Sequence, residues 1–179
     1  MSSKTTPEKQ KPAKKQWVLF AVGLIAMASG IAMIVFFGGR KILREYQKYK
    51  LMQENPVIEI AELGIKAPVL EGTDSATIAM AAGHFTGTGA PGEGNYCIAA
   101  HSSTIYKEYF NELKNARKGM KITLFDRQKN RYNYTVCDSF IVAPADTWVL
   151  DDKGDSRITL ITCTDDGAQR RVVVGKLDE

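Results

Sequence analysis

The feature that most constrains this chain is a run of roughly 20 residues without a charge, from Trp17 to Phe37. At about 1.5 Å of rise per residue, a helix of this length crosses a hydrocarbon core of about 30 Å. Lysines precede the run and Arg40 and Lys41 follow it, as expected at the two surfaces of a membrane. The sequence therefore predicts four parts: a polar tail (1–16), a transmembrane helix (17–37), a juxtamembrane stalk (38–55) and a main domain (56–179).

The length and flanks of the apolar run predict an anchor that stays attached rather than a cleaved signal peptide. A signal peptide has an apolar core of about 7–15 residues, followed by a cleavage site with small residues. Here the run is longer, and it is followed by Gly38-Gly39-Arg40-Lys41. Both flanks are basic, so charge alone leaves the orientation open. A short polar tail is easiest to leave in the cytoplasm, which predicts that residues 38–179 lie outside.

After Pro56 the sequence changes to short β-branched runs separated by Gly, Pro, Asn and Asp, which is typical of an all-β domain. Two short helices are expected, at 75–81 and 109–116. Many short strands at this spacing predict a sandwich or a barrel, closed so that no edge stays unpaired. The predicted strands are 57–61, 67–70, 95–100, 120–125, 132–142, 157–163 and 171–176.

Composition argues against several classes of partner. The net charge is only +4, and the basic excess lies in the first fifty residues, so the main domain shows no footprint for nucleic acid. Two histidines and three cysteines without a Cys-x-x-Cys pair do not support a zinc site. Asp151-Asp152 could bind calcium, but a solvated acidic turn is the preferred interpretation. We therefore expect no cofactor.

Cys163 is the candidate nucleophile, because it ends a β-branched run and its side chain can emerge at the rim of a sheet. Thiolate is the attacking form, and an ordinary cysteine is mostly protonated near neutral pH, so a basic or cationic neighbour is needed. The preferred partner is His101, which ends the run 95–100. His84 is its rival, but it lies in the glycine-rich stretch 83–94 and is interpreted as a turn residue.

Two further sets of residues accompany this pair. An arginine can hydrogen-bond a developing oxyanion, and Arg170 and Arg171 follow the cysteine closely. Strand alternation allows only one of them to point into the site, and it leaves open which one. Thr162, Ala100 and Ser102 flank the cysteine and the histidine and are expected to contact the substrate. The remaining cysteines, Cys97 and Cys137, lie in apolar runs and are expected to be buried thiols.

Three ordered blocks of this sequence resemble the sortases, membrane-anchored transpeptidases of Gram-positive bacteria. The family signature T-L-x-T-C is matched by residues 159–163. A strand ending in histidine is matched by residues 94–101, with Ala100 where glycine is common. An arginine followed by apolar residues and a small one is matched by residues 170–175. Weaker similarities extend the resemblance over most of residues 57–177.

The resemblance implies a closed eight-stranded β-barrel with short helices. It also implies that Cys163 is the nucleophile, His101 its acid/base partner and Arg170 the substrate arginine, with Arg171 as the fallback. The implied reaction cleaves an LPXTG-like sorting signal between Thr and Gly through a thioacyl-enzyme. An amine of a cell-wall precursor or a pilin then takes the acyl group. The implied location is the cell membrane, with the amino terminus in the cytoplasm and the enzyme outside.

Several alternatives stay open. No Asp-Pro-aromatic lid motif lies between the apolar run and the main domain, which argues against the pilin-polymerising class but does not separate the other classes. The connection 143–156 is expected to read the side chains of the sorting signal. The same fold could act mainly as a hydrolase. A membrane-tethered barrel that binds a partner and keeps Cys163 as a structural residue is the non-enzymatic alternative.

Overall fold

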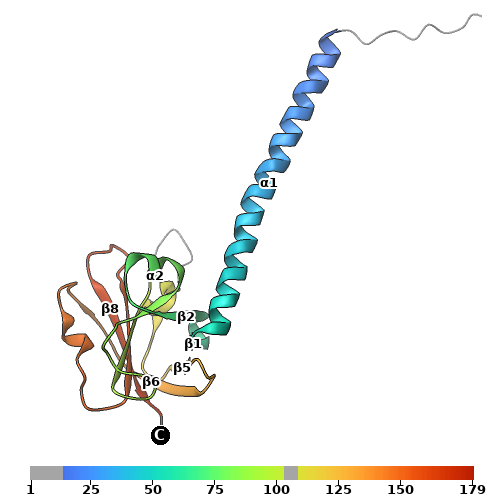
Figure 1. Cartoon of the computed structure of the whole chain (residues 1–179). Coiled ribbons are helices and arrows are strands. Elements are labelled where there is room, and N and C mark those ends of the chain that lie inside the picture. Colours follow the sequence, from blue (N-terminus) through green and yellow to red (C-terminus); the bar gives the residue numbers. More distant parts are fainter. Residues whose placement is uncertain (1–13, 103–108) are drawn as a thin grey trace, which may run out of the picture. The chain divides into compact units, whose positions relative to one another are not determined.

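The computed structural model describes residues 14–102 and 109–179. It divides into two units, 1–46 and 47–179. The first unit is the greater part of α1 (Lys14–Glu54), which is a continuous helix (Figure 1). Its large apolar side chains from Trp17 to Phe37 are exposed. Among the described residues this is the one helix long and apolar enough to cross a membrane. The helix ends before Pro56, a residue that disfavours helical backbone in the residue before it.

Eight strands among the described residues of the second unit form a closed barrel, as predicted. Their order around the barrel is β1-β2-β3-β4-β7-β8-β6-β5. The antiparallel pairing of β1 with β5 closes it. Two pairs are parallel, β2 with β3 and β4 with β7. The strands are β1 (Val57–Ile60), β2 (Ile65–Glu71), β3 (Ala82–His84), β4 (Asn95–Ala99), β5 (Lys121–Phe125), β6 (Arg131–Val142), β7 (Arg157–Cys163) and β8 (Arg170–Leu177).

Four short helices connect the strands in the part of the chain that the structure describes. The expected helix near 75–81 is α2 (Ser75–Met80), which begins where the Asp74 side chain accepts hydrogen bonds from the backbone of Ala76 and Thr77. The expected helix 109–116 falls partly on a 3₁₀ helix, η2 (Asn111–Asn115). Two further 3₁₀ helices were not expected, η1 (Ala61–Leu63) and η3 (Thr147–Leu150).

The interpretation of His84 as a turn residue of the glycine-rich stretch 83–94 was wrong, because Ala82–His84 is a strand. β3 has only three residues, all buried, and the run Ala-Gly-His carries none of the β-branched side chains that mark a strand in sequence. Its glycine is required by a close approach. A Cβ on Gly83 would lie 2.2 Å from the Gly72 carbonyl oxygen, so only glycine fits here.

The barrel packs apolar side chains on both of its faces. The interior holds alternate residues of the strands, among them Ile98, Leu160 and Val173. A second, smaller cluster lies on the outer face of β7 and β8, where Ile161, Val172 and Val174 pack under Val149 of η3. β7 is therefore apolar on both faces, which explains its unbroken β-branched sequence. This second cluster is called the outer apolar face below.

Candidate active site

The parallel pairing of β4 with β7 brings the two expected catalytic strand ends to the same edge of the barrel. Ala99 is the register partner of Ile161, and His101 and Cys163 each lie two residues further on. Two hydrogen bonds continue the pairing past the strands. The Ala100 N–H donates to the Ile161 carbonyl at 3.2 Å, and the Thr162 hydroxyl donates to the Ala100 carbonyl at 2.7 Å. The backbones that carry His101 and Cys163 are thereby held side by side.

The antiparallel pairing of β7 with β8 separates the two arginines. Cys163 is directly opposite Arg170, and Thr162 is directly opposite Arg171. Directly opposite residues place their side chains on the same face of a sheet. Arg170 therefore shares the outer face with Cys163, and Arg171 starts on the inner face with Thr162.

The arginine side chain is held by the loop between the two strands. The Arg170 guanidinium donates through Nη1 to the carbonyls of Gly167 and Gln169, at 3.3 and 3.1 Å. Cys163 and Arg170 are both partly buried, while His101 is exposed. A substrate carbonyl that bound Arg170 would compete with these two loop carbonyls for the guanidinium.

The expected substrate contacts fall into two groups. Thr162 is 4% exposed and Ala100 is also 4% exposed, and the hydrogen bond between them links β7 to the chain after β4. Ser102 is only partly buried and lines a small cavity of about 50 Å³ beside Cys163. Arg171 lines the same cavity. Thr162 and Ala100 are therefore buried and link the two strand ends, whereas Ser102 is accessible to a ligand.

His84, the rival base, lies in a different network. It is 9% exposed on β3, and its Nδ1 lies 2.8 Å from a carboxylate oxygen of Glu71. Its Nε2 lies 3.0 Å from the Thr88 hydroxyl, and its ring stacks on Tyr96 at 4.3 Å between centroids. These contacts hold the loop after β3 against β2 and β4, so the interpretation of His84 as a turn residue is corrected to a buried strand residue.

The other two cysteines differ from each other. Cys97 is fully buried in β4, and burial raises the pKa of its thiol to about 11, so it stays protonated at neutral pH. Cys137 is only half-buried, which corrects the expectation of a buried thiol. It is the extra residue at a break in the β6–β8 register between Val136 and Asp138, and its thiol donates to the Val174 carbonyl at 3.4 Å.

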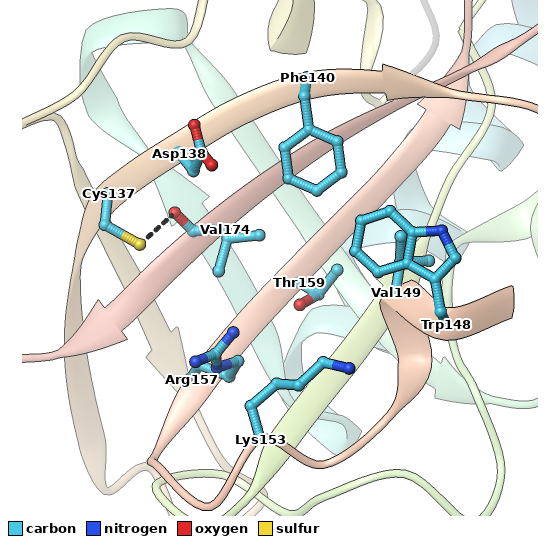
Figure 2. Close-up of a pocket in the computed structure, with 9 residues that line it drawn as sticks. All are labelled: Cys137, Asp138, Phe140, Trp148, Val149, Lys153, Arg157, Thr159 and Val174. Carbon is cyan, nitrogen blue, oxygen red and sulfur yellow. Dashed lines mark hydrogen bonds between the residues drawn. The ribbon is translucent and has the colours of Figure 1, made fainter. Parts of the chain in front are cut away.

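A larger hollow of about 430 Å³ lies on the outer face of β6, β7 and β8 (Figure 2). The rings of Phe140 and Trp148 stack along one side of it, 5.7 Å apart between centroids. Its nearest residue of β7 to the thiol is Thr159, four positions before Cys163. None of the expected catalytic residues lines this hollow. The larger volume of this hollow is therefore no reason to place the candidate active site there.

The two acidic residues considered for calcium have partners of their own. Asp151 accepts from Lys153 at 3.2 Å, and Asp152 accepts from the backbone of Gly154 at 3.0 Å. Across residues 14–102 and 109–179, no group of three or more His, Cys, Asp or Glu side chains is arranged to hold a metal ion. Both carboxylates are therefore engaged by neighbouring residues of the same loop.

One contact at the site has no clear signal in the sequence. Lys114 of η2 forms an ion pair with Asp165, two residues after the expected nucleophile, with Nζ–O distances of 2.9 and 3.1 Å. The pair is 51 residues apart in sequence, and an Asp-Asp dipeptide in a loop is interpreted most simply as solvation. The fold alone brings Lys114 to this loop.

Comparison with known proteins identifies the family. The sortase domain profile matches residues 58–178. The chain is 31% identical to sortase A of Streptococcus agalactiae over 96% of this chain and 67% of that protein. It is 34% identical to sortase A of Bacillus anthracis over 67% of this chain, but this match spans only 58% of that protein.

Solved structures agree with the sequence comparison. Sortase A of Listeria monocytogenes superposes with a TM-score of 0.66 and 29% identity, over 71% of this chain and 88% of that chain. The sortase D5 transpeptidase of Clostridium perfringens superposes with a TM-score of 0.64 and 30% identity, over 75% of this chain and 89% of that chain. Because the sortase domain profile covers more than half of the chain, and a sortase A relative is 31% identical over 96% of it, this chain belongs to the sortase family of cysteine transpeptidases.

Proposed function

We propose that this protein is a membrane-anchored transpeptidase that cleaves an LPXTG-like sorting signal between Thr and Gly and transfers the acyl part to an amine. The observation that carries the proposal is the meeting of three strand ends. Cys163 lies directly opposite Arg170, and the chain after β4 brings His101 to the same edge. The family match and the sortase A relatives support the same activity.

Each of the three residues has one task in this proposal. The Cys163 thiolate attacks the carbonyl carbon of the threonine, and Arg170 donates to the oxygen that becomes negative. His101 protonates the departing glycine nitrogen, so the C–N bond breaks and a thioester remains. Thr162 and Ala100 hold the two strand ends in register, and Ser102 is placed to contact the peptide.

The apolar part of α1 anchors the protein in the membrane in this proposal. Its side chains from Trp17 to Phe37 are exposed in the described structure, so they need an apolar solvent. We place the amino-terminal tail in the cytoplasm and the barrel outside, where surface proteins and cell-wall amines are available.

The experiment uses the full chain in detergent micelles, an LPXTG-type peptide and glycinamide as the amine. We expect a peptide–glycinamide adduct by mass spectrometry, with no adduct from Cys163→Ala. Cys137→Ala is the matched control, because it removes a partly exposed thiol elsewhere in the barrel, and it should keep activity within about twofold.

Other outcomes separate the alternatives. Cleavage without any amine adduct would identify a hydrolase of the same fold. Equal behaviour of the parent chain and Cys163→Ala on every peptide would contradict a catalytic role for the cysteine and would favour a binding module.

A further inference from the structure

The small cavity beside Cys163 lies between the chain after β4 and the loop from β7 to β8. Besides the expected site residues, Lys114 of η2 and Thr164 and Asp165 of the loop line it. Thr162 and Arg171, which begin on the inner face, line it as well, so it opens on the side of Cys163 away from the outer apolar face. The cavity thus gives Cys163 a neighbouring polar surface.

The polar side already holds an alkyl ammonium group. Lys114 Nζ donates to both carboxylate oxygens of Asp165, at 3.1 and 2.9 Å. Both side chains remain open to solvent, with exposed fractions of 44% for Lys114 and 52% for Asp165. An ion pair this exposed adds little stability, so the lysine can be exchanged for another cation at small cost.

Asp165 differs in charge from the other ionisable side chains described at the cavity. Among the described residues that line the cavity, Asp165 is the one carboxylate, and the cations are Lys114 and Arg171. Asp166 follows in the chain, but its carboxylate is engaged within the loop by the Thr164 hydroxyl and the Ala168 N–H. Among these described groups, a second ammonium ion would find a carboxylate only by taking the place of Lys114 at Asp165.

Resting on the proposed function, we propose that this cavity binds the acceptor amine, with Asp165 holding its ammonium group and Lys114 as the resident competitor. Asp165 lies two residues after Cys163, so at about 3.3 Å per residue the two backbones are at most about 7 Å apart. An amine held by Asp165 would therefore lie beside the thioester that forms on Cys163.

The transfer step balances without any further reactant. The bound ammonium gives up a proton, its nitrogen forms the new C–N bond, and the C–S bond to Cys163 breaks. The departing sulfur takes up a second proton from the nitrogen as the amide forms. A thioester and an ammonium ion thus yield an amide, a thiol and one proton released to solvent. Asp165 raises the local concentration of the amine and does not itself react.

The test measures the dependence of transfer on amine concentration, using the full chain in detergent micelles with glycinamide, which is largely cationic near neutral pH. In Asp165→Asn we expect the KM for glycinamide to rise about fivefold or more, while kcat and amine-free hydrolysis change less than about twofold. Lys114→Gln should act in the opposite direction and lower this KM, because the competitor is removed.

Two controls show that charge is what the cavity recognises. Asp166→Asn removes the same charge one residue away and should leave the KM unchanged. Hydroxylamine, an amine that is largely neutral near pH 7.5, should show the same KM with the parent chain and with Asp165→Asn. An unchanged glycinamide KM in Asp165→Asn would overturn the proposal, and so would a rise in KM in Lys114→Gln. The proposed function fails separately, if the parent chain forms no adduct with either amine.

Discussion

At the scale of single residues, Arg170 and Arg171 are chemically identical neighbours that differ in the face of β8 on which they start. Arg170 lies opposite Cys163 and Arg171 lies opposite Thr162. We therefore expect Arg170→Ala to lower kcat by about 100-fold or more, as for the loss of an oxyanion donor. Arg171→Ala should lower it by less than about tenfold. The rate of adduct formation is measured for both variants. A larger loss of kcat in Arg171→Ala than in Arg170→Ala would contradict the assignment.

The three thiols also differ as single residues. Burial raises the pKa of Cys97 to about 11, so at pH 7.5 less than about 0.1% of it is thiolate. Because the folded pKa is raised, this thiol becomes reactive only as the pH approaches that value. We expect iodoacetamide to label Cys163 and to spare Cys97 in the native chain. Mass spectrometry of peptides measures this, and labelling of all three cysteines in denaturant is the control.

At the scale of elements, the shortest strand carries the sharpest packing constraint. β3 lies between β2 and β4, and a Cβ on Gly83 would lie 2.2 Å from the backbone oxygen of Gly72. We expect Gly83→Ala to lower the free energy of unfolding by about 2 kcal/mol or more, because backbone must move. Urea unfolding measures this loss.

Gly64→Ala is the matched control for this prediction. Gly64 has a φ of +62°, and a Cβ there meets no atom within 4 Å, so alanine adds only backbone strain of about 1 kcal/mol. Equal losses in the two variants would show that β3 tolerates displacement.

Most elements could be predicted from sequence because their side chains alternate or form β-branched runs, as in β5, β6 and β7. β3 could not, because its three residues, Ala82–His84, are defined by pairing with distant strands. The same reason explains the error at Cys137. A register break in β6 is a property of the β6–β8 pair, and the sequence of one strand does not show it.

At the scale of the whole molecule, we propose that the apolar helix holds the barrel at the membrane. We expect the full chain to stay in the membrane fraction and the fragment 47–179 to be soluble, because this fragment lacks the apolar run. In protoplasts, external protease should digest the barrel and spare a tag at the amino terminus. Digestion of the barrel only after lysis would contradict the proposed orientation.

The sequence by itself determined the apolar segment, the all-β class and the positions of Cys163 and His101 at strand ends. These features depend on the local pattern of side chains and on short motifs, which can be read in the sequence without knowing the tertiary contacts. Only the tertiary structure decided that Arg170 faces Cys163 and that Lys114 lies on Asp165. Such contacts depend on strand register and on loops that meet across the barrel, so their physical cause is the packing of segments distant in sequence.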